Sequence, residues 1–167
     1  MVIRRVNDDE VKDFAELART TGTHVRFIEY MPLDADGKWQ RDSVVTGDEL
    51  LEAAETEFSQ RPRANAHDPA TRFGFADGAP GELGFINSVS APFCERCNRV
   101  RITADGQLRT CLFSITETDL RGPLRGGADD VAIAAVIRDA VWRKEPGHRI
   151  NEPDFVRRAR SMSPIGG

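Results

Sequence analysis

The sequence predicts an α/β fold, in which a strand–helix–strand unit is followed by antiparallel strands and a further helix. Three observations favour this class. Residues 1–32 alternate between strand and helix patterns with short links, as in a βαβ unit with parallel strands. After residue 72, apolar residues alternate with glycine turns, which is typical of antiparallel strands. Residues 129–142 carry apolar side chains at helical spacing.

Length and composition indicate a globular chain. Its 167 residues are 40% hydrophobic and 30% charged, enough for one domain with a core. A net charge of -4 argues against general binding of nucleic acid. No apolar run approaches the roughly 18 residues of a membrane span, and the N-terminus lacks a signal-peptide pattern. We therefore expect no membrane partner. Three cysteines cannot all pair in disulfides within one chain, so we expect a cytoplasmic location, where thiols stay reduced.

Residues 1–22 supply the first predicted strand and helix. Met1–Val6 is strand-like, and Asn7 or Asp8 can cap the helix that follows. Gly22 suits the end of that helix. The apolar stripe of the helix recurs at a spacing of three and four residues. Its members are Val11, Phe14, Ala15 and Ala18.

The segment "THVRFIEYMPL" is the second predicted strand, which ends near Pro32. Thr46 and Glu49 match a capping box, the pattern in which two side chains satisfy the first N–H groups of a helix. We expect this helix to reach about Phe58. Residues 59–74 are expected to be irregular, because they combine two prolines with mixed charge.

Residues 99–113, "RVRITADGQLRTCLF", predict a hairpin that turns at Asp105-Gly106. A two-residue loop would place Cys111 opposite Val100. A three-residue loop with a bulge would place Cys111 opposite Arg101, on the face that Arg101 shares with the arginine two residues earlier. We predict the second register, because it brings the cysteine and the arginines together.

Every cysteine of the chain lies in residues 93–113, as a Cys94–Cys97 C-x2-C pair and a third, Cys111, with thirteen residues between the pair and the third. Thiolates suit zinc or an iron–sulfur cluster. A structural zinc site needs a fourth ligand, whereas three cysteines on a cubane cluster leave one iron open. Buried cysteines that act as small apolar residues are a third interpretation. The histidines that could complete a zinc site are His24, His67 and His148.

Four arginines, at positions 96, 99, 101 and 109, surround the cysteines in a chain that is acidic overall. Arg99 and Arg101 are two residues apart, so on a strand they share a face and could bind an anion with paired hydrogen bonds. The alternative is that they are the solvent side of an exposed strand.

The stretches "RFIEYMPL" and "SVSAPFCERCNRVRITADGQLRTCLF" and the terminal "GG" resemble the C-terminal half of the GTP 3′,8-cyclase family. These are radical-SAM enzymes that start molybdenum-cofactor biosynthesis, and the resemblance covers nearly the whole chain. It implies the last βαβα elements of an incomplete (β/α)6 barrel at residues 1–60. Residues 61–167 would then form an extension with the hairpin, a cluster site, C-terminal helices and a Gly-Gly tail.

The resemblance also implies roles for individual residues. Cys94, Cys97 and Cys111 match ligands of a 4Fe–4S cluster whose open iron the purine of GTP reaches. The family's substrate-contacting basic residues match Arg26, near the phosphates, and Arg99 and Arg101. Met31 matches a position that helps seat S-adenosylmethionine. Gly166 and Gly167 match a tail that enters the active site and aids substrate activation.

The chain departs from the family pattern in one respect: it contains no C-x3-C-x2-C motif. We therefore expect it to bind S-adenosylmethionine, and to turn over GTP, only with a separate N-terminal fragment that supplies this motif. A homodimer is the other expected partner. The product would pass toward cyclic pyranopterin monophosphate synthase. Unpaired strands at the edge of a half barrel predict poor solubility of the chain alone. The competing hypothesis is a non-enzymatic module with a structural Cys3His zinc site.

Overall fold

The computed structural model describes residues 1–33, 37–62 and 65–157, and these adopt an α/β fold, as predicted. The chain divides into two compact units. The first unit combines Met1–Met31 with Trp39–Cys97, and the second combines Pro32–Lys38 with Asn98–Gly167. In the described part of the chain, no helix is both long enough and apolar enough to span a membrane.

A four-stranded sheet in the order β1-β4-β3-β2 forms the frame of the first unit. Strand β1 (His24–Ile28) pairs with β4 (Glu82–Ile86) in parallel, as the βαβ prediction requires. Strand β3 (Thr71–Phe75) is antiparallel to both β4 and β2 (Phe58–Arg61). The antiparallel strands predicted after residue 72 are therefore confirmed.

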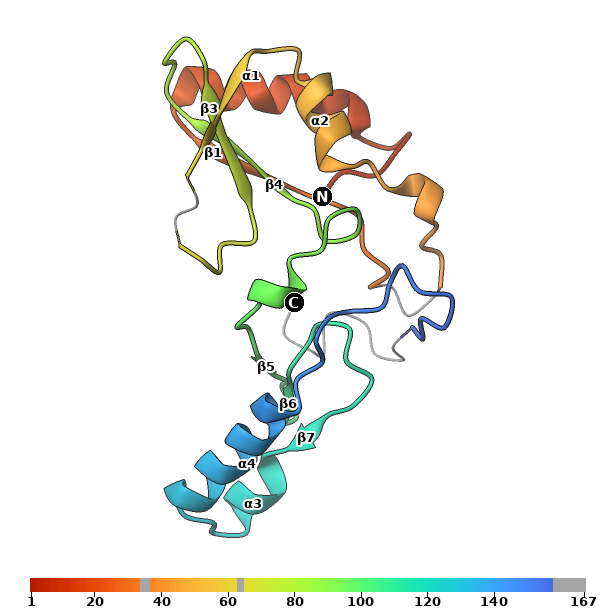
Figure 1. The fold of residues 1–167 in the computed structure, drawn as a ribbon, viewed down its shortest axis with the longest axis vertical. Coiled ribbons are helices and arrows are strands. Elements are labelled where there is room, and N and C mark those ends of the chain that lie inside the picture. Colours follow the sequence, from red (N-terminus) through yellow and green to blue (C-terminus); the bar gives the residue numbers. More distant parts are fainter. Residues whose placement is uncertain (34–36, 63–64, 158–167) are drawn as a thin grey trace. The chain divides into compact units, whose positions relative to one another are not determined.

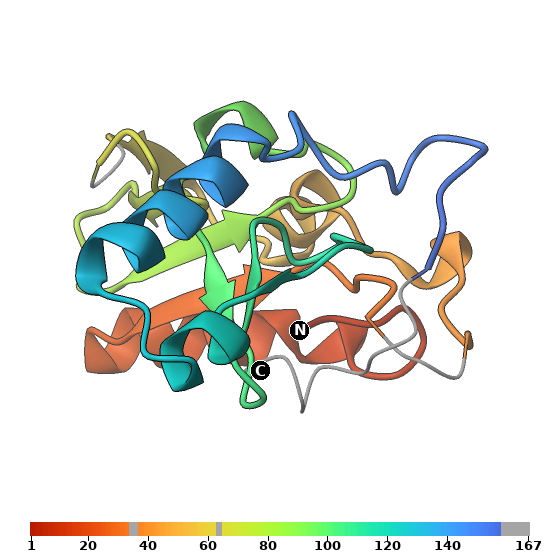
Figure 2. The same cartoon turned by 90° about the horizontal axis from the view of Figure 1, so that it is seen from below.

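Helices α1 (Val11–Thr21) and α2 (Gly47–Ala53) pack on one face of this sheet. Helix α1, in red, lies along the sheet in both views (Figure 1, Figure 2). Because side chains alternate along a strand, most apolar residues of the sheet point to this face, whereas Ile28 and Ile86 lie on the opposite one. The shared core consists of Val2, Val11, Ala15, Ala18, Phe27, Val45, Leu50, Ala54, Phe75, Leu83 and Phe85.

The predicted stripe of α1 is largely confirmed. Its valine and two alanines are buried, whereas Phe14 is 41% exposed and meets Phe27 edge to face at 6.3 Å. Gly22 ends the helix in the left-handed conformation, at φ 75°, as predicted. The α1 cap was predicted wrongly. Asn7 and Asp8 instead accept backbone N–H bonds from Ile3 and Arg5, and so close the preceding turn (Arg4–Asn7).

Two further predictions for the first unit are wrong. The expected strand Met1–Val6 is reduced to isolated bridges, Val2 to Glu29 and Ile3 to Val44, because the turn that follows breaks it. The expected helix to Phe58 ends at Ala53, just before Glu55 adopts φ 48°. Phe58 begins β2 instead, since its ring packs on those of Phe73 and Phe75.

The predicted capping box at the start of α2 is confirmed. Thr46 Oγ1 accepts the Glu49 N–H at 3.3 Å, and Glu49 Oε2 accepts the Thr46 N–H at 2.8 Å. That backbone bond, together with Arg4, lowers the pKa of the Glu49 carboxyl. The carboxylate therefore stays ionised near the positive end of the helix, which stabilises this end.

Replacing Thr46 by alanine should lower the free energy of unfolding by about 1 kcal/mol, because an N–H of the first turn loses its acceptor. Urea denaturation measures the change. The control is Thr20→Ala at an exposed position of α1, where a change within about 0.5 kcal/mol is expected. An equal decrease in the free energy of unfolding in the two variants would contradict the capping role of Thr46.

The second unit contains a small antiparallel sheet and two helices. Strands β5 (Arg101–Ile102), β6 (Gln107–Arg109) and β7 (Thr118–Asp119) lie in that order. Helices α3 (Arg121–Arg125) and α4 (Asp130–Trp142) follow (Figure 1). The predicted helix at 129–142 is confirmed, and Asp129 caps it by accepting the Ala132 N–H at 2.8 Å. The core of this unit includes Leu108, Leu120, Val136, Ile137 and Ala140.

The hairpin has the predicted three-residue loop length but not the predicted register. Its loop is residues 104–106, with Gly106 at φ 81°, and Arg101 pairs with Arg109 rather than with Cys111. Thr103 decides the register: its N–H bonds to the Gln107 carbonyl, and its Oγ1 accepts the Gln107 N–H. Because of these bonds, the strand pairing starts one residue earlier than expected. Arg101 therefore pairs with a residue two positions before the predicted partner, Cys111.

Candidate functional site

A single tight turn presents the first two cysteines. The 3-10 turn Cys94–Arg96 is held by bonds from Arg96 N to Phe93 O at 3.1 Å and from Cys97 N to Cys94 O at 3.0 Å. Both cysteines are half-buried, and neither is in a disulfide. The C-x2-C pair thus lies on one tight turn, from which two cysteines can bind a shared metal or cluster.

A buried carboxylate anchors the segment that leads to this turn. Glu29, 1% exposed just after β1, accepts the N–H of Val89 at 2.6 Å, the N–H of Ser90 at 2.8 Å and the Ser90 hydroxyl. Sequence reasoning did not single out Glu29. The available signal was an acidic residue within the apolar stretch "RFIEYMPL", since a buried carboxylate requires partners.

His67 contacts the cysteine turn, although it lies 27 residues before Cys94 in the chain. Its Nδ1 is 2.7 Å from the carbonyl oxygen of Arg96. A carbonyl can only accept, so Nδ1 donates, and the neutral ring keeps its lone pair on Nε2. A histidine oriented in this way can ligate a metal. Of the three candidate histidines, His67 is therefore the one held against the C-x2-C turn.

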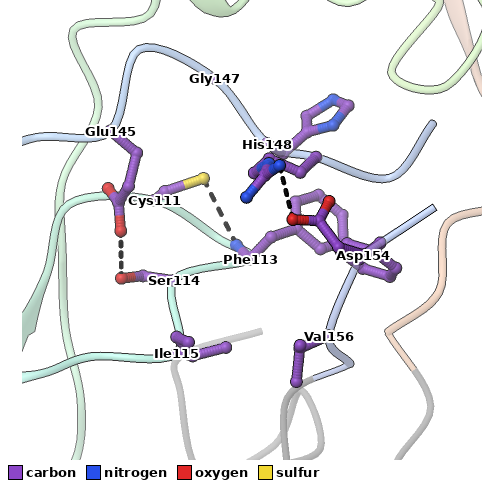
Figure 3. Close-up of a pocket in the computed structure, with 11 residues that line it drawn as sticks. Cys111, Phe113, Ser114, Ile115, Glu145, Gly147, His148, Asp154 and Val156 are labelled. Atoms are coloured by element: carbon purple, nitrogen blue, oxygen red, sulfur yellow. Dashed lines mark hydrogen bonds and ion pairs between the residues drawn. The ribbon is translucent and has the colours of Figure 1, made fainter. Parts of the chain in front are cut away.

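Cys111 belongs to the second unit, where its Sγ accepts the Phe113 N–H at 3.4 Å (Figure 3). Hydrogen bonds to sulfur are among the factors that set the reduction potential of an iron–sulfur cluster. Cys111 is half-buried, is not in a disulfide and lines a pocket of about 230 Å³. Phe113, Ser114, Glu145, His148 and Phe155 also line it.

Glu145 and Lys144, just after α4, form hydrogen bonds with residues on both sides of Cys111 in the chain. The Glu145 carboxylate accepts the hydroxyl of Ser114 (Figure 3) and that of Thr110, the latter at 2.7 Å. Burial raises the pKa of Glu145, but these hydrogen bonds and Lys144 outweigh it and leave the pKa below its ordinary value. Lys144 Nζ donates to the carbonyls of Thr110 and Arg99, the latter at 2.7 Å.

The arginines around the cysteines differ in their environments. Arg99 is exposed and Arg101 is half-buried, so both present surface to a ligand. Arg109, 2% exposed, is an internal group that pairs with Glu117 at 2.6 Å and with the Ser114 carbonyl. Arg26 lies in the first unit, where it pairs with the buried Glu82.

The remaining predicted residues are Met31, Gly166 and Gly167. Met31 is half-buried after the end of β1. The two glycines lie outside the described residues. Within either unit, the described chain gathers no three His, Cys, Asp or Glu side chains into a preformed metal site. The cysteine pair belongs to the first unit and Cys111 to the second, so the three-cysteine ligand set stays a prediction.

The residues nevertheless suit an iron–sulfur cluster by their chemistry: three cysteines outside disulfides, two of them on one turn and the third with an N–H donor. Fold and motif together define an α/β protein with a three-cysteine motif. The family model for Molybdenum Cofactor Synthesis C matches residues 23–150. The chain belongs to this family.

Similar proteins extend over most of the chain. GTP 3′,8-cyclase of Mycolicibacterium smegmatis is 48% identical over 166 residues, which are 95% of this chain and 45% of that protein. GTP 3′,8-cyclase of Streptomyces coelicolor is 44% identical over 165 residues, which are 97% of this chain and 48% of that protein. The predicted resemblance is thereby confirmed. The chain spans about half the length of these curated relatives.

Proposed function

We propose that this chain binds a 4Fe–4S cluster through Cys94, Cys97 and Cys111, and binds GTP beside it. In this role it would serve the first step of molybdopterin biosynthesis, the conversion of GTP to 3′,8-cyclo-GTP. The observation that carries the proposal is the set of three cysteines, none of them in a disulfide, in a chain 48% identical to a GTP 3′,8-cyclase. When bound, the cluster would supply an open iron to which a purine can coordinate.

The chain's own residues then position the nucleotide. Arg99 and Arg101 present guanidinium groups for anionic oxygens, and Arg26 supplies a third. Met31 would help seat S-adenosylmethionine. The Gly166–Gly167 tail would aid substrate activation. Such positioning lowers the barrier by fixing the substrate before reaction.

We further propose that residues 1–60 are the last elements of an incomplete (β/α)6 radical-SAM barrel, with residues 61–167 as its extension. The parallel pairings β1 to β4 and Val2 to Glu29 support this. Because these 167 residues contain no C-x3-C-x2-C motif, turnover would need residues outside them that supply it, as a separate N-terminal fragment would. The product would supply cyclic pyranopterin monophosphate synthase in the cytoplasm.

Anaerobic reconstitution with iron and sulfide tests the nucleotide role. We expect a brown protein whose EPR signal changes when GTP is added. Arg99→Ala and Arg101→Ala should each weaken GTP binding about tenfold, since each removes hydrogen bonds to an anion. The control is Arg138→Ala on an exposed part of α4. An EPR signal indifferent to GTP, or unchanged affinity in both variants, would remove the substrate role.

A structural zinc site is the second candidate function, and the contact of His67 with the cysteine turn is the observation that favours it. It predicts a colourless protein with about one zinc per chain. His67→Ala would then release the metal, whereas a three-cysteine cluster would persist in this variant. Metal analysis of the two proteins separates the candidates.

A further inference from the structure

The face of the first unit's sheet opposite α1 and α2 carries three arginines and one buried acid. Strand periodicity places them on this face, which we name the arginine face: Arg26 of β1, Arg61 of β2, Arg72 of β3 and Glu82 of β4. Glu82 is 3% exposed, whereas the side chains of Arg26 and Arg72 are 33% and 20% exposed. The acid is thus covered, and the guanidinium groups retain access to solvent.

Glu82 holds two of these arginines, Arg26 and Arg72. Arg72 grips it with two nitrogens: Nε is 2.9 Å from Oε1, and Nη2 is 2.5 Å from Oε2. Arg26 uses only Nη2 toward this acid, at 2.6 Å from Oε1. The remaining Arg72 nitrogen, Nη1, donates to the Pro62 carbonyl at 3.3 Å. Arg26 makes one further, long hydrogen bond, from Nη1 to the Val25 carbonyl at 3.4 Å. Arg72 is therefore committed to the clamp, whereas Arg26 keeps its other N–H groups for a ligand.

The clamp remains charged at neutral pH. Burial raises the pKa of Glu82, but hydrogen bonds from Arg72 and Arg26 and their charges outweigh it, so the pKa lies below its ordinary value. Two guanidinium groups then face one carboxylate. The cluster keeps one net positive charge, which suits an anion.

A glycine makes room for Arg26. Gly84 lies opposite Arg26 on one side and opposite Arg72 on the other. A Cβ at this position would lie 2.5 Å from Cδ and 2.8 Å from Nε of Arg26. Contacts this short force the neighbouring side chain to move. Arg26 therefore lies flat across β4 only because residue 84 has no side chain.

We propose that Gly84, Glu82 and Arg72 are positioning residues, which hold Arg26 across the arginine face with donors free for a phosphate oxygen. The identity of that anion, the phosphates of a nucleotide, rests on the proposed function. The positioning itself rests on the contacts within the first unit. Holding a guanidinium in place before binding reduces the entropy lost when the anion arrives.

Binding of inorganic tripolyphosphate and of GTP, followed by calorimetry on the whole chain, tests the proposal. Arg26→Ala and Gly84→Ala should each weaken both affinities about tenfold or more, although Gly84→Ala changes no charge. The control is Gly74→Ala on the same face, which displaces Arg61 instead. Unchanged affinity in Gly84→Ala, or equal losses in the two glycine variants, would overturn the proposal.

Glu82→Gln separates positioning from plain electrostatics, because the two predict opposite signs. Removing a negative charge alone would tighten anion binding, whereas releasing Arg26 weakens it. We expect weaker binding by severalfold. Tighter binding would overturn the positioning role of Glu82.

A second measurement separates the positioning of Arg26 from the proposed binding of a phosphate by this side chain. In an isotope-labelled chain, the Arg26 Nε–H signal should report a rigid side chain in the wild type and a mobile one, with an order parameter below about 0.6, in Gly84→Ala. A mobile Arg26 in the wild type overturns the positioning. A rigid Arg26 whose loss leaves GTP and tripolyphosphate affinity unchanged supports the positioning and overturns its phosphate-binding role.

Discussion

A chain with Cys111 replaced by alanine is expected to retain less than about a tenth of the wild-type cluster after anaerobic reconstitution. The reason is the ligand count. Cys94 and Cys97 come from one turn, so losing Cys111 leaves the cluster held from one side only. Iron and sulfide analysis, with the visible absorption of the cluster, measures the loss.

The matched control is Ser59→Ala at an exposed position of β2, which should load as the wild type does. Cys94→Ala and Cys97→Ala should behave like Cys111→Ala, because all three thiolates ligate one group in the proposal. Wild-type iron content in any of the three cysteine variants would refute the shared ligand set.

Replacing Glu29 by glutamine should lower the free energy of unfolding by about 2–4 kcal/mol. The carboxylate accepts two backbone N–H groups and a hydroxyl, all from Val89 and Ser90, while 1% exposed. A glutamine offers one oxygen and places an amide N–H₂ among donors, so at least one buried N–H loses its partner.

Urea denaturation measures that loss, and hydrogen exchange at Val89 and Ser90 shows where it acts. The control is Glu52→Gln on an exposed part of α2, with a change within about 0.5 kcal/mol. Because residues 88–90 lead directly to the Cys94 turn, we also expect slower cluster loading in Glu29→Gln. Unaltered exchange at both amides would contradict the anchoring role.

Features decided by neighbours in the chain were predictable from the sequence. The Thr46–Glu49 capping box, the left-handed Gly22 and the helix capped by Asp129 each depend on groups within four residues. The C-x2-C turn is equally local. Short-range geometry leaves few alternatives for such patterns, so sequence and structure agree there.

Features that depend on distant partners were not predictable. Phe58 was expected at the end of a helix, but it forms a strand because the aromatic rings of Phe73 and Phe75, fifteen and seventeen residues later, pack against it. Sequence spacing does not contain this information. The hairpin register is a different case, because its decisive bonds are local: Thr103 closes the turn onto Gln107, one residue earlier than the Asp105-Gly106 pattern indicated.

The sequence by itself determined the donor chemistry of this protein: three thiols at cluster spacing, with arginines beside them and no C-x3-C-x2-C motif. Only the tertiary structure decided which buried charges support those groups. Glu29 bonds to a segment 60 residues away and Glu82 to an arginine 56 residues away. A buried carboxylate must find donors wherever the folded chain places them, so its partners follow from the packing of strands rather than from residue order.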